Sequence, residues 1–481
     1  MNTKLLKQKI LDLAIRGKLT QQLKSDGTAT DLLKEICDRT QEKTSLRAKR
    51  GNPSPQTIIP LDKSEAPFEV PANWEWVRLG DYLDVRDGTH DSPKYVECGY
   101  PFVTSKNLIN GTIDFSNCKQ VSKQDFEKIE ERSHVDDGDI LYAMIGSIGN
   151  PVLVKKTCDF AIKNVALFKK RDTFTNMHFV FYWLQFVEKD LKVNAAGGLQ
   201  PFVSLSMFRE RCFPLPPLAE QQRIVAKIED AFAEIDAVEK NKELLKTHIK
   251  QTRQKFLDLA IHGKLVPQDE NDEPAGVLLE RITRDNPHYE KIEDEPFEIP
   301  ENWAWVRIND IASDMADGPF GSNLKAEHYT DKKEARIIQL SNIAENGWKD
   351  ENVRYTTFEH AKKNISRSIV EAGNLVIAKM MPAGRAMICP STEKMYVLSS
   401  DAVKLVPIDE INNQFLCYAI NSPYFKAQVN GNIQGTTRLR TSISKLRECL
   451  LALPPLAEQA RIVAKIEELF STLDQMERNL I

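Results

Sequence analysis

The sequence of 481 residues lacks the signals of a membrane protein, a secreted protein or a metal site. No apolar run approaches the ~18 residues that a membrane helix needs, and the start, MNTKLLKQKILDL, has no apolar signal core. The eight cysteines include no C-x-x-C pair and no zinc-ligand spacing. We therefore expect a cytoplasmic protein with free thiols, no metal and no membrane partner.

Motifs of common enzymes are also missing. The GKL triplets at Gly17 and Gly263 have leucine where a P-loop needs serine or threonine, and there is no H-E-x-x-H and no Asn-Pro-Pro-aromatic methyltransferase site. These absences predict a non-catalytic chain, although a nuclease carboxylate cluster stays an open alternative because its motifs are weak. The net charge of −4 excludes a surface coated with basic side chains. Nucleic-acid binding needs only a local basic patch.

What the sequence has is three blocks that recur in the same order. LDLAIRGKL at 11–19 returns as LDLAIHGKL at 257–265, and PFEVPANWEWVR at 67–78 returns as PFEIPENWAWVR at 296–307. LPPLAEQQRIVAKIE at 215–229 returns at 453–467 with one change. The chain is therefore a duplication of domain-sized halves. The recurring tryptophans are predicted to pack in the core: Trp74, Trp76, Trp303 and Trp305.

The third block opens a long helix. From Ala219 to about Ile261 there is no glycine or proline, and apolar residues recur at steps of three and four. This heptad pattern predicts a rod of about 60 Å. The C-terminal and N-terminal helices, joined end to end, would reproduce the central one, which predicts a circular repeat with two antiparallel rods. Two unrelated core helices are the alternative. The predicted seam comprises Ile224, Ile228, Ile235, Val238, Leu245, Ile249, Ile462, Ile466, Leu469 and Leu473.

Between the repeated blocks lie two divergent middles that share only short anchors. Asp87-Gly88 matches Asp317-Gly318, and GDILYAMIGSIGN at 138–150 aligns with GNLVIAKMMPAGR at 373–385. Short β-branched runs bounded by Gly and Asn predict small mixed α/β domains. The predicted organisation is an N-terminal helix and connector (1–66), a variable domain (67–214), a central helix (215–266), a connector (267–295), a second variable domain (296–452) and a C-terminal helix (453–481).

A fold kept constant while its surface changes is typical of a reader of two different ligands. The segment 426–447 carries five basic residues and no acid, among Gly, Ser, Thr, Asn and Gln side chains that bond phosphates and base edges. A solvated basic loop is the alternative for this segment. His90 could suggest a metal ligand or a general base. No second ligand stands at suitable spacing, so base contact or turn formation is the better interpretation.

These features resemble the DNA-specificity subunits of type I restriction–modification systems. LPPLAEQQRIVAKIE and its repeat look like the spacer region of that family, while DGTHDSPKY, GDILYAMIGSIGN and GPFGSNLK are similar to its target-recognition domains. The resemblance implies an α+β fold with two recognition domains in pseudo-two-fold tandem repeat, separated by two long antiparallel coiled-coil helices. It also implies a chain that reads a bipartite, asymmetric DNA site, one half per domain.

The resemblance further implies partners and contacts. Two methyltransferase subunits would dock on the rods, and restriction subunits would join them. S-adenosylmethionine, Mg²⁺ and ATP would then bind those partner subunits, and this chain would bind no cofactor. Alternatives are the specificity module of another multisubunit methyltransferase or nuclease, and a coiled-coil scaffold that binds no DNA. The predicted DNA contacts are Asp87, Gly88, Thr89, His90, Lys106, Asn107, Ser147, Asn150, Gln200, Asp317, Phe320, Ser322, Asn323, Asn342, Lys379, Arg385, Thr436, Thr437, Arg438 and Arg440.

Overall fold

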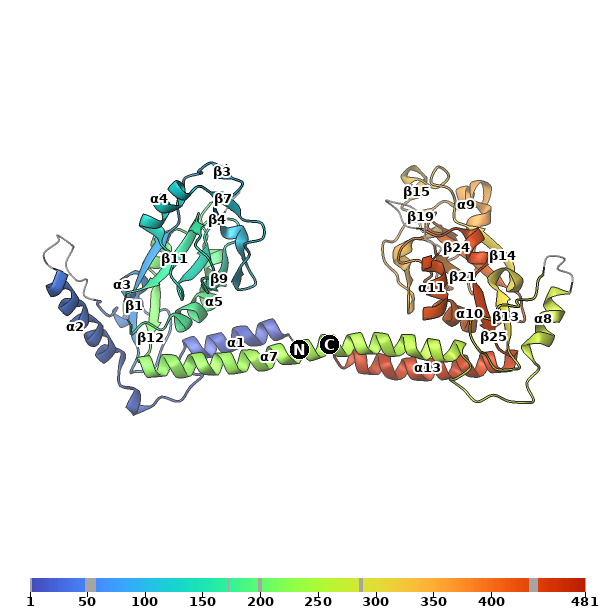
Figure 1. Ribbon diagram of the computed structural model, residues 1–481, viewed down its shortest axis with the longest axis horizontal. Helices are drawn as coiled ribbons and strands as arrows, with labels where there is room; N and C mark the ends of the chain where they lie inside the picture. Colours follow the sequence, from blue (N-terminus) through green and yellow to red (C-terminus); the bar gives the residue numbers. More distant parts are fainter. Residues whose placement is uncertain are drawn as a thin grey trace. The chain divides into compact units, whose positions relative to one another are not determined.

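The computed structural model describes residues 2–47, 58–171, 173–197, 201–284, 289–431 and 440–480. It divides into two compact units, Met1–Asn241 and Lys242–Ile481 (Figure 1). The first part of the long helix α7 (Leu218–Ile261) belongs to the first unit, and its last part belongs to the second. None of the described helices is both long and apolar enough to cross a bilayer.

In the first unit, α1 (Thr3–Ile15) lies antiparallel to the first part of α7. The Lys7 ammonium contacts Asp236 at 2.5 Å and sits 5.1 Å from the centre of the Phe232 ring. The hydroxyl of Thr3 donates to Glu239. The predicted seam residues Ile224, Ile228 and Ile235 are buried, but Val238 is 50% exposed because α1 begins beside it.

In the second unit, α13 (Leu456–Arg478) lies antiparallel to the last part of α7 in the same register. Arg253 pairs with Asp474 and sits 5.1 Å from the centre of the Phe470 ring, as Lys7 does with Asp236 and Phe232. The described pairing therefore confirms that the rod helices are copies. Among the seam residues of this unit, the buried ones are Ile249, Ile462, Ile466 and Leu473, Leu469 is half-buried, and Leu245 is 41% exposed.

Local sequence explains where the rod helices begin and end. Pro216 and Pro217 precede α7, where a missing N–H costs nothing. Gly17 and Gly263 follow α1 and α7 with φ of 66° and 65°, the left-handed conformation that ends helices. A Cβ at Gly17 would lie 2.4 Å from Pro71, so the second block packs directly against this turn.

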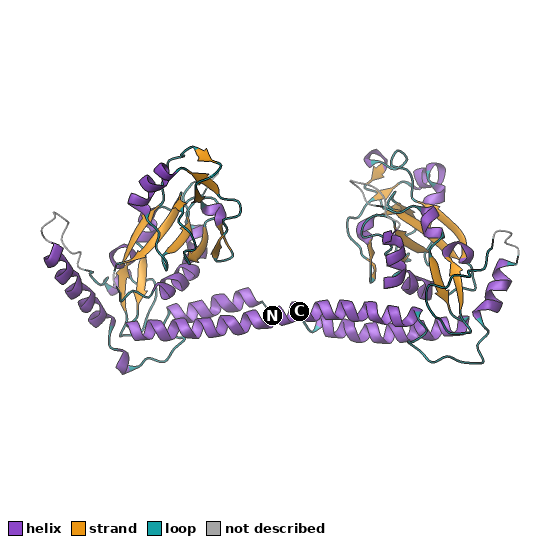
Figure 2. Cartoon of the chain, viewed as in Figure 1, coloured by secondary structure: helices purple, strands orange, loops and turns teal. Residues whose placement is uncertain are grey.

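The first unit contains a four-stranded sheet, β2-β11-β8-β9, a second one, β10-β4-β7-β3, and the pairs β1-β12 and β5-β6 (Figure 2). Only the pairing of β10 with β4 is parallel among the described ladders of this unit. The bounds are β1 (Glu75–Arg78), β2 (Leu83–Asp87), β3 (Tyr95–Val96), β4 (Tyr100–Val103), β5 (Leu108–Ile109), β6 (Thr112–Ile113), β7 (Lys119–Val121), β8 (Ile140–Ala143), β9 (Gly149–Leu153), β10 (Ala161–Ile162), β11 (Val165–Lys170) and β12 (Cys212–Leu215).

The second unit repeats these sheets as β14-β24-β21-β22, β15-β19-β16-β23-β20, β13-β25 and β17-β18, with β20 as an added strand. The bounds are β13 (Ala304–Arg307), β14 (Ala312–Asp317), β15 (Tyr329–Thr330), β16 (Ala335–Ile338), β17 (Ile343–Ala344), β18 (Gly347–Trp348), β19 (Tyr355–Thr356), β20 (Ile369–Val370), β21 (Leu375–Ala378), β22 (Ala386–Ile388), β23 (Tyr396–Leu398), β24 (Ala402–Pro407) and β25 (Leu450–Leu453).

Helices cover these sheets, and α5 packs on β9 as α10 packs on β22. Both helices carry apolar runs, FVFYWLQFV at 179–187 and QFLCYAI at 414–420. The remaining bounds are α2 (Ala29–Arg47), α3 (Leu79–Tyr82), α4 (Lys123–Ser133), α5 (Met177–Val193), α6 (Leu205–Arg209), α8 (Ala275–Thr283), α9 (Phe358–Asn364), α10 (Asn413–Ile420), α11 (Pro423–Gly431) and α12 (Ile443–Arg447).

A buried carboxylate of the third repeated block joins the second block and the connector in the first unit. Glu220, in the first turn of α7, accepts hydrogen bonds from Nε1 of Trp74 at 2.9 Å and from Nε2 of Gln22 at 2.6 Å. Its side chain is inaccessible to solvent. We call this set the first frame node: Glu220, Trp74 and Gln22. The node fixes the variable domain to the rod, because its members come from the residue before β1, the connector and α7.

The second unit has the same node. Glu458 accepts from Nε1 of Trp303 at 2.9 Å and from Nε2 of Gln268 at 2.6 Å, and it is equally inaccessible. Burial raises the pKa of the Glu458 carboxyl, while the two hydrogen bonds oppose that shift. We call Glu458, Trp303 and Gln268 the second frame node. The predicted packing role of the tryptophans is confirmed, and Trp74 and Trp303 have a polar role as well.

Candidate nucleic-acid interface

In the first unit, the chain leaves β2 through a tightly held loop, residues 87–90, which we call the first Asp-Gly loop. The Asp87 carboxylate is buried and contacts the Arg132 guanidinium at 2.6 Å and Nε2 of His90 at 2.8 Å. Nδ1 of His90 lies 2.8 Å from Oδ1 of Asn164. A Cβ at Gly88 would lie 2.3 Å from the Ile162 carbonyl oxygen, so glycine is needed for this close approach.

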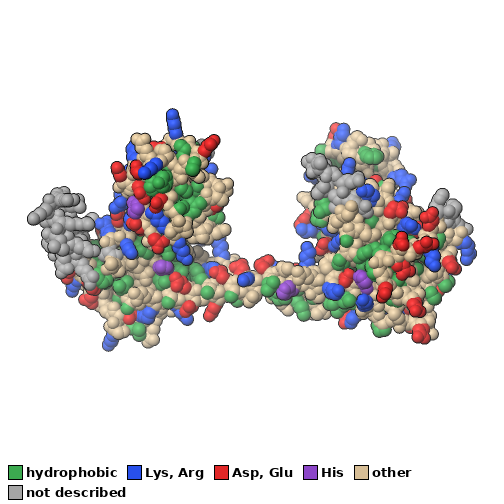
Figure 3. Space-filling model, viewed as in Figure 1, with side chains coloured by type: hydrophobic (Ala, Val, Ile, Leu, Met, Phe, Trp, Pro, Cys, Tyr) green, Lys and Arg blue, Asp and Glu red, His purple; other side chains and the backbone are tan. Residues whose placement is uncertain are grey.

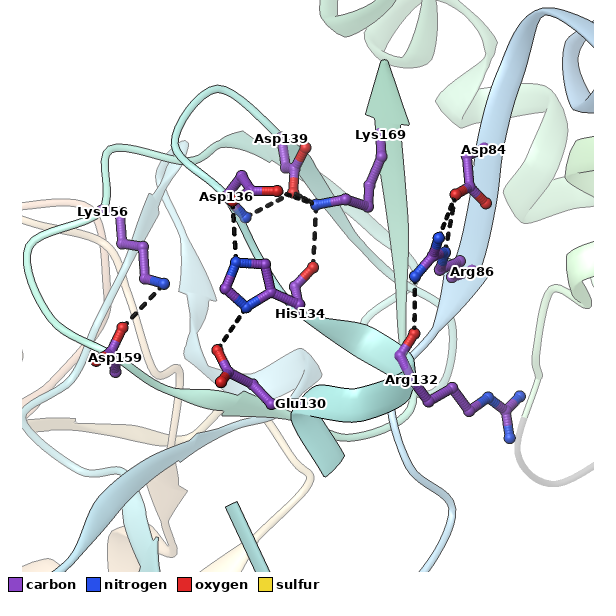
Figure 4. Close-up of polar contacts among 10 residues, drawn as sticks. All are labelled: Asp84, Arg86, Glu130, Arg132, His134, Asp136, Asp139, Lys156, Asp159 and Lys169. Atoms are coloured by element: carbon purple, nitrogen blue, oxygen red, sulfur yellow. Dashed lines mark hydrogen bonds and ion pairs between the residues drawn. The ribbon is translucent and has the colours of Figure 1, made fainter. Parts of the chain in front are cut away.

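Arg132 is positioned by a charged network at the end of α4 (Figure 4). Its carbonyl accepts from Arg86 at 3.1 Å, and its guanidinium extends away from the network. Beside it, the Lys169 ammonium contacts Asp139 and, at 2.8 Å, Asp136. The hydrogen bond from Lys169 lowers the pKa of the Asp136 carboxyl, whereas burial raises that of Asp139. The network holds the helix end from which Arg132 reaches Asp87.

Next to the first Asp-Gly loop lies a cleft of about 570 Å³. It brings together three of the predicted residues, Lys106, Asn107 and Ser147, with Asn164, the partner of His90. Lys119 and Lys163 also line it, and Asp114 is its one acidic lining residue. A polar, mainly basic cleft of this kind can bind phosphates or base edges.

Sequence reasoning missed Lys119, Lys163 and Asn164. The sequence signal for Asn164 is its place directly before the apolar run VALF, where an asparagine is typical of a turn. Its φ of 54° in the structure is a left-handed conformation that asparagine tolerates. Conversely, Asn107 is buried, and its amide group bonds Thr104 and the Asp114 carbonyl within its own loop. Asn107 therefore shapes the cleft wall rather than projecting into it.

The other predicted residues of this unit are dispersed. Thr89 is half-buried in the first Asp-Gly loop, and Asn150 is exposed at the start of β9, outside the cleft lining. Gln200 lies outside the described residues. The chain just after it meets the cleft, because the Gly146 amide donates to the Pro201 carbonyl.

In the second unit, the corresponding loop spans residues 317–323, and we call it the second Asp-Gly loop. Asp317 contacts the Lys379 ammonium at 2.5 Å. A Cβ at Gly318 would lie 1.7 Å from the Ser399 carbonyl oxygen. Phe320 is 82% exposed, and Ser322 and Asn323 are also exposed.

Lys379 links this loop to a third segment. Its carbonyl accepts from the Thr441 amide at 3.0 Å, and Met380 forms a β-bridge with Arg440, which is exposed. The structure therefore brings Asp317, Lys379 and Arg440 together. The neighbouring predicted residues Thr436, Thr437 and Arg438 lie outside the described residues.

Two predicted residues of the second unit lie elsewhere. Asn342 is fully buried and donates to the carbonyls of Lys349 and Glu351. Arg385 is half-buried in a groove of about 400 Å³ that it shares with Glu345 and Lys250 of α7, and burial lowers its pKa. Arg385 and Lys379 stand close in the sequence, at the two ends of the segment 379–385. The tight turn between them sends Arg385 toward the rod.

Figure 3 shows basic and acidic side chains interspersed over the visible face of each unit, so the basic character is local, as the net charge suggests. Among the residues that the structure describes, no group of three or more His, Cys, Asp or Glu side chains could hold a metal ion. The eight cysteines are free thiols. The site is thus a set of loops with hydrogen-bonding and cationic groups, mounted on two copies of one domain.

A duplicated α+β fold with divergent polar loops defines a class of two-domain readers, and comparison with known proteins identifies the family. The model of the type I restriction modification DNA specificity domain matches residues 71–247 and 300–481, so the chain belongs to that family. Its members are the non-catalytic DNA-recognition subunits of type I restriction systems.

Two curated relatives from Escherichia coli extend the match along the chain. The EcoEI specificity subunit is 24% identical, covering 99% of this chain and 90% of its own, and the EcoAI specificity subunit is 25% identical, covering 98% and 90%. The fold is similar to a chain in a solved structure on complex assembly and conformational transition of a type I restriction–modification system. That chain is 19% identical, with a TM-score of 0.56, covering 86% of this chain and 94% of its own.

Proposed function

We propose that this specificity subunit reads a bipartite, asymmetric DNA site, with one half-site for each variable domain. The observation that carries the proposal is that the two units share one order of strands, whereas the contacts of their Asp-Gly loops differ. The sheet orders of the two units correspond strand for strand apart from β20. Yet the repeated aspartate binds Arg132 and His90 in one loop and Lys379 in the other. Equal scaffolds with different donors suit two different base sequences.

Exposure divides the predicted residues by role. Exposed side chains are proposed to contact bases or phosphates: Lys106, Ser147, Asn150, Phe320, Ser322, Asn323 and Arg440. Buried or paired ones are proposed to position the loops: Asp87, Gly88, Thr89, His90, Asn107, Asp317, Asn342 and Lys379. Gln200, Thr436, Thr437 and Arg438 stay proposed contacts on sequence grounds alone. Arg385 is assigned to the groove beside α7 rather than to base contact.

The rods are proposed to set the gap between half-sites and to dock two methyltransferase subunits, with restriction subunits joining that complex in the cytoplasm. Exposed apolar side chains on the rod helices support docking: Val238 and Leu245 were expected in the seam but are largely solvent-accessible. S-adenosylmethionine, Mg²⁺ and ATP would then bind the partners. The domain boundaries predicted above are part of this proposal.

The test is to map methylated adenines in cells that express the whole complex. Replacing Lys106 and Ser147 by alanine should relax the bases selected in one half-site, and replacing Ser322 and Asn323 should relax only the other. Val277→Ala, an exposed apolar change in α8 outside the variable domains, is the control and should leave the site intact. A single undivided site, or both halves changing with either variant, would contradict the proposal.

A further inference from the structure

The third residue after the repeated aspartate is aromatic in both units. It is His90 in the first Asp-Gly loop and Phe320 in the second. The two rings differ in their surroundings. His90 has hydrogen-bonding partners on both ring nitrogens, whereas Phe320 is 82% exposed, more than any other large hydrophobic side chain among the described residues.

The exposure of Phe320 is imposed by the loop. Gly318 is pressed against the Ser399 carbonyl, and the Asn323 amide donates to the Phe320 carbonyl at 2.8 Å, which closes a turn. Nε2 of His360 lies 2.8 Å from the Asn323 carbonyl oxygen, and the His360 ring stacks on His328 with centroids 4.3 Å apart. The loop is therefore anchored at both ends and holds its ring in water, against the hydrophobic effect.

The surroundings of Phe320 indicate what covers it. Ser322, Asn323 and Lys325 are exposed polar neighbours in sequence, and Lys379 and Arg440 lie beside the root of the loop. A protein-binding patch would place apolar side chains around the ring. One aromatic ring among hydrogen-bond donors and cations suits a nucleic acid instead, because every base offers a flat face and every phosphate a charge.

Resting on the proposed function, we propose that Phe320 inserts beside a base of the second half-site and unstacks one base step. Apolar wedges of this kind open a step and add specificity through the deformability of the sequence. His90 occupies the same loop position, but its ring is tied to Asp87 and Asn164. The first half-site is therefore read without such an unstacked step.

The test uses the complete complex of the chain with its partner subunits and duplexes that carry the mapped site. 2-Aminopurine, whose fluorescence rises on unstacking, replaces one base at a time in each half-site. The wild-type complex should brighten at one position of the second half-site, apart from any signal at the adenine that is methylated. Phe320→Ala should abolish that brightening and weaken binding about tenfold or more, the range for loss of one stacked base.

Controls separate insertion from other roles. Val353→Ala removes an exposed apolar side chain of the same unit, 54% accessible, and should change neither signal. Phe320→Leu keeps an apolar wedge and should restore part of the brightening, while the signal at the methylated adenine should persist in every variant. Unchanged brightening and affinity in Phe320→Ala would overturn the insertion. Failure of the wild-type complex to bind the mapped duplex would instead reject the proposed function.

Discussion

The frame nodes and the Asp-Gly loops are both duplicated, yet only the nodes have kept their partners. Glu220 and Glu458 accept from tryptophan at 2.9 Å and from glutamine at 2.6 Å in the two units. Asp87 and Asp317 begin equivalent loops, but their partners differ. A repeated residue therefore marks a repeated position and does not by itself mark a repeated contact.

Burial explains why the nodes have kept their partners. Each frame glutamate is inaccessible to solvent, so loss of one partner leaves a buried polar group unpaired, at a cost of roughly 1–3 kcal/mol per group. The Asp317 side chain is 40% exposed, and water can replace a lost partner there. Asp87 is buried instead, and Arg132 and His90 are its partners. The two loops therefore satisfy the same aspartate in different ways on one fold, which is what a reader of two sequences requires.

The largest expected effect comes from changing the spacer while leaving both nodes and both loops intact. Deleting residues 241–244 from α7 removes four residues, or about 6 Å of helix, which corresponds to about two base pairs. The deletion also turns the helix by roughly 40°, in the same sense as the twist of the DNA that is removed. Mapping of methylated adenines should therefore show unchanged half-sites separated by a shorter gap.

A seven-residue deletion, 241–247, is the matched control. It shortens α7 by about 10 Å but restores the helix phase to within about 20°. Three base pairs of DNA turn by roughly 100°, so the two readers would face different sides of the duplex and methylation should fail. A shortened rod that keeps the gap and alters the bases selected would show that α7 does not set the spacing.

Breaking a frame node should cost stability in its own unit. Glu458→Ala leaves the Trp303 indole and the Gln268 amide without their buried acceptor, and we expect a loss of about 3 kcal/mol in unfolding free energy. Glu220→Ala should cost the same in the first unit, because its two shortest bonds are equal. Hydrogen exchange resolved by peptide measures each unit separately, which matters because a two-unit chain need not unfold in one step.

Glu458→Gln is the conservative control for that pair. Its amide oxygen can still accept from Trp303, so the loss should be smaller than for alanine. If the two alanine variants destabilised their units very differently, the two nodes would share the same hydrogen-bond distances but would not contribute equally to stability. If neither opened its unit, the buried carboxylate would not hold the frame.

The frame could be predicted from the sequence, and the contacts within the loops could not. The repeated blocks predicted the first residue of α7 to within one position, and they predicted that Trp74 and Trp303 are buried. They could not show that Glu220 accepts from Trp74, because that contact joins residues 146 positions apart. Periodicity also placed Val238 and Leu245 in a seam, although a heptad pattern does not reveal where a partner helix begins or ends.

The loops were harder because their geometry depends on nonlocal contacts. Arg385 and Lys379 flank one turn in the sequence, yet one side chain lies against α7 and the other on Asp317. Asn107 and Asn342 were predicted to contact DNA, but both use their amides to bond the backbone of their own loops. Lys163 and Asn164 directly precede β11, and the fold brings them to the cleft beside Lys106 and Ser147.

The smallest effect is expected from two ion pairs between the rod helices, those of Lys7 and Arg253, which we call the rod clasps. Lys7 and Arg253 occupy equivalent positions in the two units but are different side chains. Lys7 contacts one carboxylate and the Phe232 ring, while Arg253 contacts Asp474 and, at 3.5 Å, Glu477, and lies over Phe470. Surface ion pairs contribute little, so Lys7→Ala should cost about 0.5 kcal/mol. Arg253→Ala should cost about 1 kcal/mol, because its side chain is only 18% exposed and its planar fork serves two acids.

The salt dependence of stability separates the ion pair of each clasp from its packing over the phenylalanine ring. Raising the salt to ~1 M shortens the screening length to about 3 Å, so the ion-pair share of each loss should shrink while the packing over the phenylalanine ring remains. Lys9→Ala, a change of an exposed lysine on α1, controls for helix propensity. Peptide-resolved hydrogen exchange of α1 and α13 gives the two losses. Equal losses for Lys7 and Arg253 at low salt would mean that the second carboxylate and the deeper burial of Arg253 add nothing to the rod.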